Sequence, residues 1–381
     1  VIYQINNTNN GTVSYGVAYN NSNIEIKVYS DSKDKVTGTI GANDNKYVKL
    51  HLKNKTSSNT TVEITAVMGY ENGGDLIVPS DSTLVTGTYT APISLAKYIT
   101  NLYANASKST VTNNSITYNY ATSESLMNDR LGGTTSSLDG GNIRYYGASP
   151  NNYVYFNCES YPTTNCELWR IVGVFDGKIK LIRNGSIGSY SWDTSAPSIN
   201  SGYGVNEWSQ ADIMKLLNPD HESESVGGSL YYNSKSGTCY NEYNNKTTSC
   251  DFTSTGIKND TTRNMIAETT WNLGGWNVSN LFSNVMYEKE RGTTVISNPS
   301  DGITRATTWT GKIALPYPSD YGYATDLSKC SQTCRNNDWM YPILGASNYG
   351  WLLTPSSSSD CYAFYVDSTG SVRLDSPIVC N

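Results

Sequence analysis

The sequence predicts two folds in one chain, an all-β sandwich at the N-terminus followed by a disulfide-stapled α+β domain. Two observations carry this expectation. All eight cysteines of the 381 residues follow Tyr153, and the front of the chain alternates apolar and polar residues in short runs. Because successive strand side chains point to opposite faces, such runs indicate strands with one buried face. The expected division is residues 1–90, a helical connector at 91–150 that begins the second domain, and 151–381.

The front domain consists of regularly spaced short runs. Residues 23–29, 47–52 and 61–67 alternate apolar and polar side chains, and polar turns separate them. This spacing is typical of a sandwich of the immunoglobulin-like type. Residues 1–5 predict one more short strand, which either closes its own sheet or adds to the sheet of a neighbouring molecule.

A helix is expected where the front domain ends. Residues 93–106 follow a proline, and Leu95, Ile99 and Leu102 recur at helical spacing, so the helix has one apolar face. We expect that face to pack at the start of the second domain. A helix that lies on a membrane surface is disfavoured, because the polar face carries little positive charge.

The back domain mixes strands and short helices. Residues 153–156, 168–175 and 178–183 predict strands, and Asp176-Gly177 predicts the hairpin turn between the last two. The alternation of strands and helices is too irregular for a parallel sheet, so the pattern predicts an antiparallel α+β domain.

Three helices are expected in the same domain. Ser209 and Asp212 have the spacing of a capping box before an apolar stripe that ends ahead of Pro219. Further helices are expected at residues 262–271 and 280–289.

The cysteines predict a disulfide framework. Their number is even, they occur in close consecutive pairs, and the chain has only two histidines to share a metal. We therefore expect no metal site and no cofactor. Disulfides persist in oxidising surroundings, so the protein is expected outside the cytoplasm, at the cell surface or secreted. The expected pairs are Cys158–Cys166, Cys239–Cys250, Cys330–Cys334 and Cys361–Cys380.

Composition excludes several classes of partner. A net charge of −6 argues against nucleic acid, which requires clustered Lys and Arg. No apolar stretch approaches the ~20 residues of a membrane span. Only 16% of the residues are charged, and 30 tyrosines stand against 5 phenylalanines, which suits shallow cores and exposed binding faces.

The chain begins at Val1 without an initiator Met, so we interpret it as a product whose export signal has been removed.

Catalytic motifs are missing from the sequence. His51 and His221 are not accompanied by a nucleophile elbow, and neither type of glycine-rich phosphate loop occurs. We therefore expect no catalytic residues. A pair of carboxylates for glycoside hydrolysis stays open, because their proximity is spatial and not sequential. The eight tryptophans all follow residue 150, and we expect most of them in the core.

Several motifs of the back domain are distinctive when they are taken together. They are Leu168-Trp-Arg-Ile-Val-Gly-Val-Phe175, Trp271-Asn-Leu-Gly-Gly275, Trp309-Thr-Gly-Lys-Ile-Ala-Leu315, Tyr317-Pro-Ser-Asp-Tyr-Gly-Tyr-Ala324 and Trp351-Leu-Leu-Thr-Pro355. With these motifs the chain resembles, over roughly residues 95–381, a domain recurrent in exported proteins of gut Firmicutes. That domain distantly resembles the C-type-lectin-like fold shared with formylglycine-generating enzymes, which implies a ligand face near the C-terminus. The calcium-binding motifs of true C-type lectins are absent.

The candidate ligand site lies in a hairpin at residues 362–374. Alternation places Phe364 and Val366 on the core side, which leaves other side chains facing outward. Two tyrosines, an arginine and two carboxylates on and beside a disulfide-framed hairpin have the composition of a binding hot spot. The candidate residues are Tyr362, Tyr365, Asp367, Arg373 and Asp375.

The sequence thus predicts a non-enzymatic bacterial surface protein for adhesion or ligand recognition, with a host glycan or surface protein as partner. One alternative is a pilin-like subunit of a surface filament, in which identical subunits exchange the first strand. A second alternative is a secreted carbohydrate-active enzyme.

Overall fold

A computed structural model gives the structure of the protein. It describes residues 2–8, 10–28, 37–72, 75–77, 85–130, 141–161, 164–194, 204–241, 246–346 and 349–374. The chain divides into two compact units, Val1–Asn101 and Leu102–Asn381. The expected boundary near residue 90 lies ahead of this division and stays a prediction. Both units are rich in β-sheet, and the helices are few and short.

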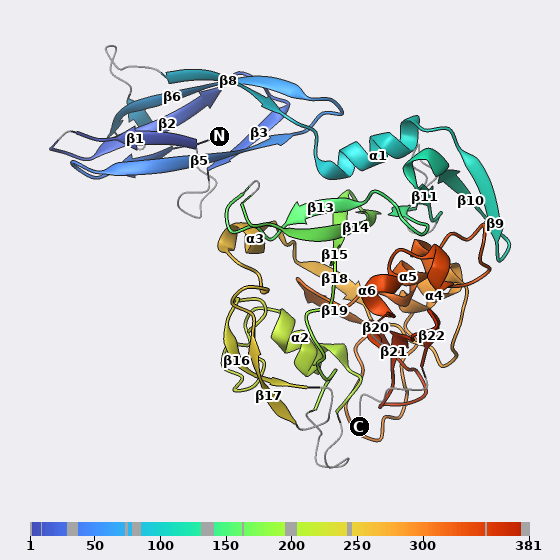
Figure 1. Cartoon of the computed structure of the whole chain (residues 1–381). Helices are drawn as coiled ribbons and strands as arrows, with labels where there is room; N and C mark the ends of the chain where they lie inside the picture. The colour runs from blue at the N-terminus through green and yellow to red at the C-terminus, as the bar shows by residue number, and fades with distance from the viewer. Residues whose placement is uncertain are drawn as a thin grey trace. The chain divides into compact units, whose positions relative to one another are not determined.

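The first unit contains, among its described residues, two antiparallel sheets that form two layers (Figure 1). One sheet has the strand order β1 (Ile2–Asn6), β5 (Asn45–Asn54) and β3 (Ile24–Val28). The other has the order β4 (Thr37–Ile40), β2 (Val13–Tyr19), β6 (Thr60–Asn72) and β7 (Asp75–Ile77), with β8 (Val85–Ala91) also paired to β6.

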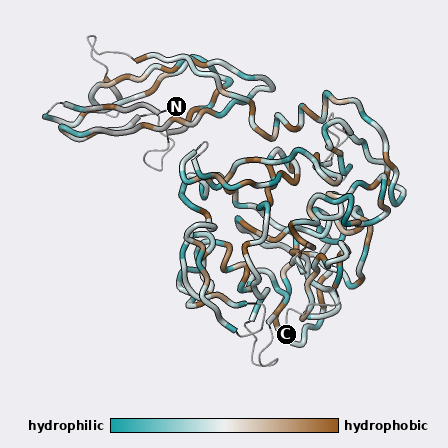
Figure 2. Tube along the Cα trace, viewed as in Figure 1, coloured by the Kyte–Doolittle hydropathy of each residue, from teal (hydrophilic) through white to brown (hydrophobic). Residues whose placement is uncertain are grey.

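One apolar core joins the two sheets. Tyr15 and Val17 of β2 are buried in it from one sheet, and Val48 and Leu50 of β5 from the other. These residues are two apart on their strands, so each pair lies on one face of its sheet. Hydrophobic and hydrophilic stretches accordingly alternate along the strands (Figure 2). The first unit is therefore a β-sandwich, and an immunoglobulin-like topology stays a prediction.

The strand at the start of the chain pairs with its own sheet. β1 runs antiparallel to β5, with Tyr3 opposite Val48 and Ile5 opposite Lys46. The sequence left two arrangements open for this segment, and in the structure the segment closes its own sheet. Among the residues that the structure describes, β1 pairs with β5 alone and is therefore an edge strand.

The largest sheet of the second unit is antiparallel, and the strands β16 to β22 form smaller sheets beside it. The spatial order of its strands is β13-β14-β12-β11-β10-β9, and β15 pairs with the side of β14 that β13 and β12 leave free. These strands are β13 (Tyr153–Phe156), β14 (Glu167–Phe175), β12 (Ile143–Tyr145), β11 (Leu126–Asn128), β10 (Ile116–Ala121), β9 (Ser109–Asn113) and β15 (Lys178–Arg183). The smaller sheets pair β16 (Ser236–Tyr240) with β17 (Thr247–Asp251), β18 (Thr269–Asn272) with β19 (Thr308–Gly311), and β21 (Ala363–Val366) with both β20 (Gly350–Pro355) and β22 (Val372–Arg373).

The helices are short apart from α1. They are α1 (Leu95–Asn105), α2 (Asp212–Leu217), α3 (Asp260–Met265), α4 (Ser283–Glu290), α5 (Pro318–Ala324) and α6 (Tyr341–Leu344), with 3-10 turns at η1 (Thr122–Glu124), η2 (Trp208–Gln210) and η3 (Arg335–Asn337). Among the described residues, no helix combines the length and apolar character that crossing a membrane requires.

The predicted helices are confirmed in place but not in every detail. The helix expected at residues 262–271 is wrong in its second half, because residues 269–272 form strand β18 against β19. The capping box at Ser209 is also wrong. Ser209 lies in the turn η2 and donates to Glu207 Oε1, while the Asp212 carboxylate accepts from Thr194 instead of the helix start.

Half of the eight tryptophans are buried in the core of the second unit, whereas the sequence predicts most of them there. Trp192, Trp208, Trp276 and Trp339 are buried. The ring of Trp192 meets that of Trp208 edge-on at 5.4 Å between centroids, and aromatic pairs prefer such tilted arrangements.

Three predicted disulfides are confirmed, and they join Cys158 to Cys166, Cys239 to Cys250 and Cys330 to Cys334. Each closes a short local ring. For the fourth expected pair, Cys361 carries no free thiol, and Cys380 lies outside the described residues.

A candidate recognition surface

The predicted C-terminal hairpin is present. Strand β21 pairs with β22, with Tyr365 opposite Arg373. Asp367 and Arg373 come together in an ion pair at 3.1 Å between Oδ2 and Nε. Tyr362 is half-buried at the start of the hairpin, and Asp375 lies outside the described residues.

The expectation that Tyr365 faces outward is wrong. Its side chain is 4% exposed. The strand that carries it is the middle one of the sheet β20-β21-β22, and the ring of Tyr349 packs edge-on against the Tyr365 ring at 5.2 Å. Strict alternation assumes that one face of the sheet meets water, whereas here both faces of β21 are covered.

Charged side chains of the hairpin itself hold its turn in place. Asp367 Oδ1 accepts hydrogen bonds from the backbone amides of Thr369 and Ser371, and its Oδ2 accepts from Arg373. The carboxylate therefore fixes the turn and neutralises the arginine beside it. A ligand role for Tyr362, Asp367 and Arg373 stays a prediction.

A different hairpin, formed by β13 and β14, has apolar side chains on its surface. Tyr153 and Tyr155 are two apart on β13, so they lie on one face, and Leu168 lies directly opposite Tyr155. All three are exposed, and the Tyr155 side chain reaches 65%. We call Tyr153, Tyr155 and Leu168 the tyrosine surface.

The arginine beside this surface holds one of its rings in place. Arg170 lies opposite Tyr153 in the register and is buried, and its guanidinium carbon is 4.0 Å from the Tyr153 ring centroid. It is also 4.7 Å from the ring of Trp339, and its Nε donates to Asn152 Oδ1. The Tyr153 ring thus rests on a fixed cation, which restricts its rotamer.

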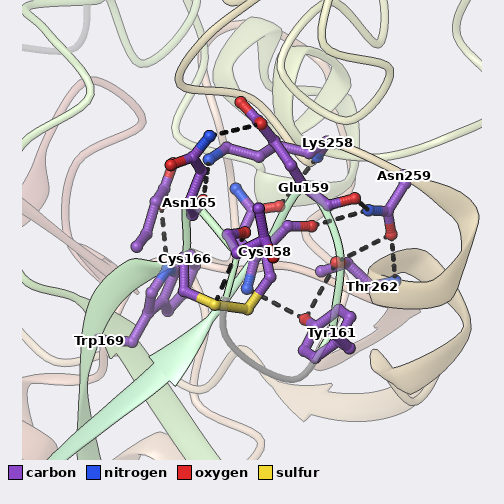
Figure 3. Close-up of a disulfide and its surroundings, with 12 residues drawn as sticks. Cys158, Glu159, Tyr161, Asn165, Cys166, Trp169, Lys258, Asn259 and Thr262 are labelled. Carbon is purple, nitrogen blue, oxygen red and sulfur yellow. Dashed lines mark hydrogen bonds between the residues drawn. A yellow bond between two sulfur atoms is a disulfide. The ribbon is translucent and has the colours of Figure 1, made fainter.

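A disulfide closes the loop between the two strands. Cys158 follows β13, Cys166 precedes β14, and the bond between them joins the two ends of the connecting loop (Figure 3). Such a cross-link restricts the unfolded loop more than the folded one. The tyrosine surface therefore stands on a covalently closed hairpin.

Hydrogen bonds fasten the same loop to α3 and the residues before it. The side-chain amide of Asn259 donates to the carbonyls of Cys158 and Glu159, at 2.7 and 3.1 Å. Lys258 Nζ donates to the carbonyl of Asn165 at 2.6 Å (Figure 3). Because Asn259 also accepts from the amide of Thr262 as the N-cap of α3, the loop and the helix share one anchor.

The second unit also contains a buried network of charges. Arg144 Nε donates to Asp129 Oδ2 at 2.7 Å, and its Nη1 donates to Asp320 Oδ1 at 3.0 Å. Lys180 pairs with the other oxygen of Asp320. Glu290 and Arg291 form a further ion pair. We call these six residues the charge cluster: Asp129, Arg144, Lys180, Glu290, Arg291 and Asp320.

The carboxyl groups of the charge cluster have opposite pKa shifts. Burial raises the pKa of Glu290 to about 7. Burial would also raise the pKa of Asp320, but Lys180 and Arg144 outweigh it and hold that pKa below its usual range. Such a split is typical of an acid and base pair in an active site. Here, however, both carboxyl groups are almost completely buried and accept hydrogen bonds from protein donors, so they do not face a substrate.

Comparisons with known proteins identify no family for this chain. No family model and no curated protein matches the chain. One solved structure that it matches is SSP-19 of Caenorhabditis elegans, described as an MSP-domain protein like family member. The sequence identity is 11%, the TM-score is 0.18, and the match covers 24% of this chain and 85% of that one. A likeness at this TM-score supports no conclusion about fold or function.

Sequence reasoning placed β13 correctly but overlooked the tyrosine surface. The signal was present, because Tyr153 and Tyr155 occupy the same face of a predicted strand and cysteines flank the loop that follows. The charge cluster gave no such signal, since its members lie far apart in the sequence.

Proposed function

We propose that this protein is a non-enzymatic recognition protein of the extracellular space, displayed at a bacterial surface, with a host glycan as its partner. The observation that carries the proposal is the tyrosine surface on a disulfide-closed hairpin. The immunoglobulin-like character of the first unit and the C-type-lectin-like character of the second belong to the same proposal.

A glycan fits this surface for two reasons. Tyr153 and Tyr155 have their Cα atoms about 7 Å apart, as residues two apart on a strand do, so neighbouring sugar rings reach both aromatic faces. A phenol ring offers an apolar face for a sugar together with a hydroxyl that stays hydrated. The exposed residues of the surface carry no charge, which suits a neutral sugar.

The rigidity of the hairpin supports the proposal as well. A binding face that is already ordered loses less conformational entropy when a ligand binds. The disulfide and the bonds from Asn259 and Lys258 provide that order. The burial of Glu290 and Asp320 supports a non-enzymatic role, because catalytic carboxyl groups must reach the substrate.

The test is binding of the whole protein to an array of neutral and acidic host glycans. We expect Tyr155→Ala, alone and with Tyr153→Ala, to abolish binding to neutral glycans while the melting temperature stays nearly unchanged. The matched control is Tyr70→Ala, which removes an exposed tyrosine from the first unit. Binding that survives the double substitution would disprove the assignment of this surface, and so would a wild-type protein that binds no glycan.

A filament subunit is a second candidate, favoured by the position of β1 at the edge of its sheet. An edge strand presents backbone groups that are able to pair with the sheet of a neighbouring copy. Electron microscopy of the native material tests this, since filaments would support strand exchange and isolated particles would count against it.

A further inference from the structure

Lys180 and Arg291, two of the three cations of the charge cluster, reach the solvent, whereas Arg144 and the carboxylates are buried. The side chains of Asp320 and Glu290 are 1% and 0% exposed, whereas those of their partners Lys180 and Arg291 are 17% and 26% exposed. Three carboxylates and three cations make the cluster formally neutral. A neutral cluster arranged in this way nevertheless presents positive charge where water and ligands approach.

Arg291 has donors to spare. Its Nη1 donates to Glu290 Oε2 at 3.0 Å and to the carbonyl of Tyr287 at 3.2 Å. Within the residues that the structure covers, Nε and Nη2 donate to no protein group. Glu290 is also engaged by Ser319, whose backbone amide and hydroxyl both donate to it. Arg291 is therefore held in position, its side chain is partly exposed, and the Nε and Nη2 edge of its guanidinium makes no hydrogen bond to the described protein groups.

Aromatic rings gather around the two cations. The ring centroid of Tyr317 is 4.5 Å from Lys180 Nζ and 5.3 Å from the guanidinium carbon of Arg291. The ring of Trp271 lies 6.0 Å from that of Tyr317, and its centroid is 5.1 Å from Lys180 Nζ. Tyr317 itself is fixed, because its hydroxyl both accepts from and donates to the backbone of Asn272. Both cations and the indole thus border one immobile ring.

These features match the chemistry of a sugar that carries a carboxylate. The Nε and Nη2 edge of an arginine binds a carboxylate through two parallel hydrogen bonds, which a lysine does not do. A half-buried indole beside the Tyr317 ring that Arg291 also borders offers an apolar face for the sugar ring. The indole N–H donates to the carbonyl of Gly311, so the ring has a fixed orientation.

We propose that Arg291, Lys180 and Trp271 form a binding site for a hexuronic acid, at the end of an acidic glycan or as the free sugar. In this site the carboxylate lies on the open edge of Arg291, Lys180 supplies a second positive charge, and Trp271 packs against the sugar ring. The site is separate from the tyrosine surface and does not depend on the proposed function.

The probes are glucuronate, glucose and acetate, each titrated into the whole protein and followed by ligand-observed NMR. We expect glucuronate to bind, acetate to bind at least tenfold more weakly, and glucose not to bind. Arg291→Gln should weaken glucuronate binding at least tenfold. Arg291→Lys, which keeps the charge but loses the planar edge, should also weaken it. Trp271→Leu should weaken the binding of glucuronate without changing that of acetate.

Two controls keep the result interpretable. Lys178→Gln removes an exposed lysine from the strand that carries Lys180 and should leave glucuronate binding unchanged. Tyr155→Ala tests the other surface and should also leave it unchanged, so the two proposals fail separately. Absence of glucuronate binding, equal affinity for acetate and glucuronate, or full binding by a folded Arg291→Gln variant would each overturn the assignment.

Discussion

The side-chain amide of Asn259 donates a hydrogen bond to the carbonyl of Cys158 at 2.7 Å. This contact connects the start of helix α3 with the first residue of the disulfide ring. Since Asn259 is also the N-cap of that helix, a single side chain orients both the helix and the loop that supports the tyrosine surface.

Substitution of Asn259 should therefore have two separable effects. Asn259→Ala removes the cap and the bonds to the loop, and we expect a loss of roughly 2–3 kcal/mol in the free energy of unfolding. Asn259→Ser keeps a capping hydroxyl that is too short to reach Cys158, so it should cost about 1 kcal/mol less. Urea unfolding measures both variants. Equal losses in the two variants would mean that the cap contributes nothing, and an Asn259→Ser variant as stable as the wild type would mean that the contact with the loop contributes nothing.

Removal of Arg144 should be far more harmful than removal of a surface cation. Arg144→Met leaves Asp129 and Asp320 with fewer partners in a buried site, and we expect a loss of about 3–5 kcal/mol. The control is Lys329→Met, which removes an exposed lysine from its pair with Asp326 and should cost less than about 1 kcal/mol. Thermal unfolding of the two variants decides whether burial sets the difference.

The stability of the protein should depend on pH through Asp338. This carboxyl is buried, accepts from Thr325 Oγ1 at 2.7 Å and has a pKa that burial raises to about 7. Between about pH 4 and pH 7 the folded state keeps a proton that the unfolded state has released. The resulting stabilisation is complete below about pH 4 and is lost as the pH rises through about 7.

Asp338→Asn removes this titration, since an amide stays neutral. Relative to the wild type, its free energy of unfolding should rise by roughly 2–3 kcal/mol between pH 5 and pH 8. Urea unfolding at both pH values checks the prediction. A stability difference between variant and wild type that is the same at both pH values would contradict it.

The disulfides should contribute according to the size of their rings. Replacement of Cys239 and Cys250 with Ala opens a ring with a separation of 11 residues and should cost about 2–3 kcal/mol. The same change at Cys330 and Cys334, four residues apart, should cost about 1 kcal/mol less. Peptide mapping without reduction checks the pairs, including the predicted Cys361–Cys380. Free thiols at any of these positions would contradict the framework.

The parts of the fold that local chemistry specifies were predictable from the sequence. The hairpin of β14 and β15 follows from two alternating runs around Asp176-Gly177, and both turn residues have the positive φ that a tight turn of this kind requires. The helix α1 follows from its apolar period. In contrast, Ser209 fits a capping box by spacing alone, and Glu207 takes its hydrogen bonds instead.

The candidate sites were harder to predict because they depend on contacts between distant segments. Tyr365 looked exposed because alternation reveals which residues share a face but not whether a second layer covers that face. Arg144 and Asp320 are 176 residues apart and carry no mark of their pairing in the sequence. Only the tyrosine surface, which lies within one hairpin, could have been read from the local pattern.

The ring closed by Cys158 and Cys166 has a consequence for how the protein survives among proteases. A single cut in the peptide chain between these two cysteines separates no fragment, because the disulfide still joins both sides. The bonds from Asn259 and Lys258 hold each side of the cut against the rest of the second unit. A molecule cut there would stay in one piece until the disulfide is reduced, and it would still present Tyr155 to a ligand.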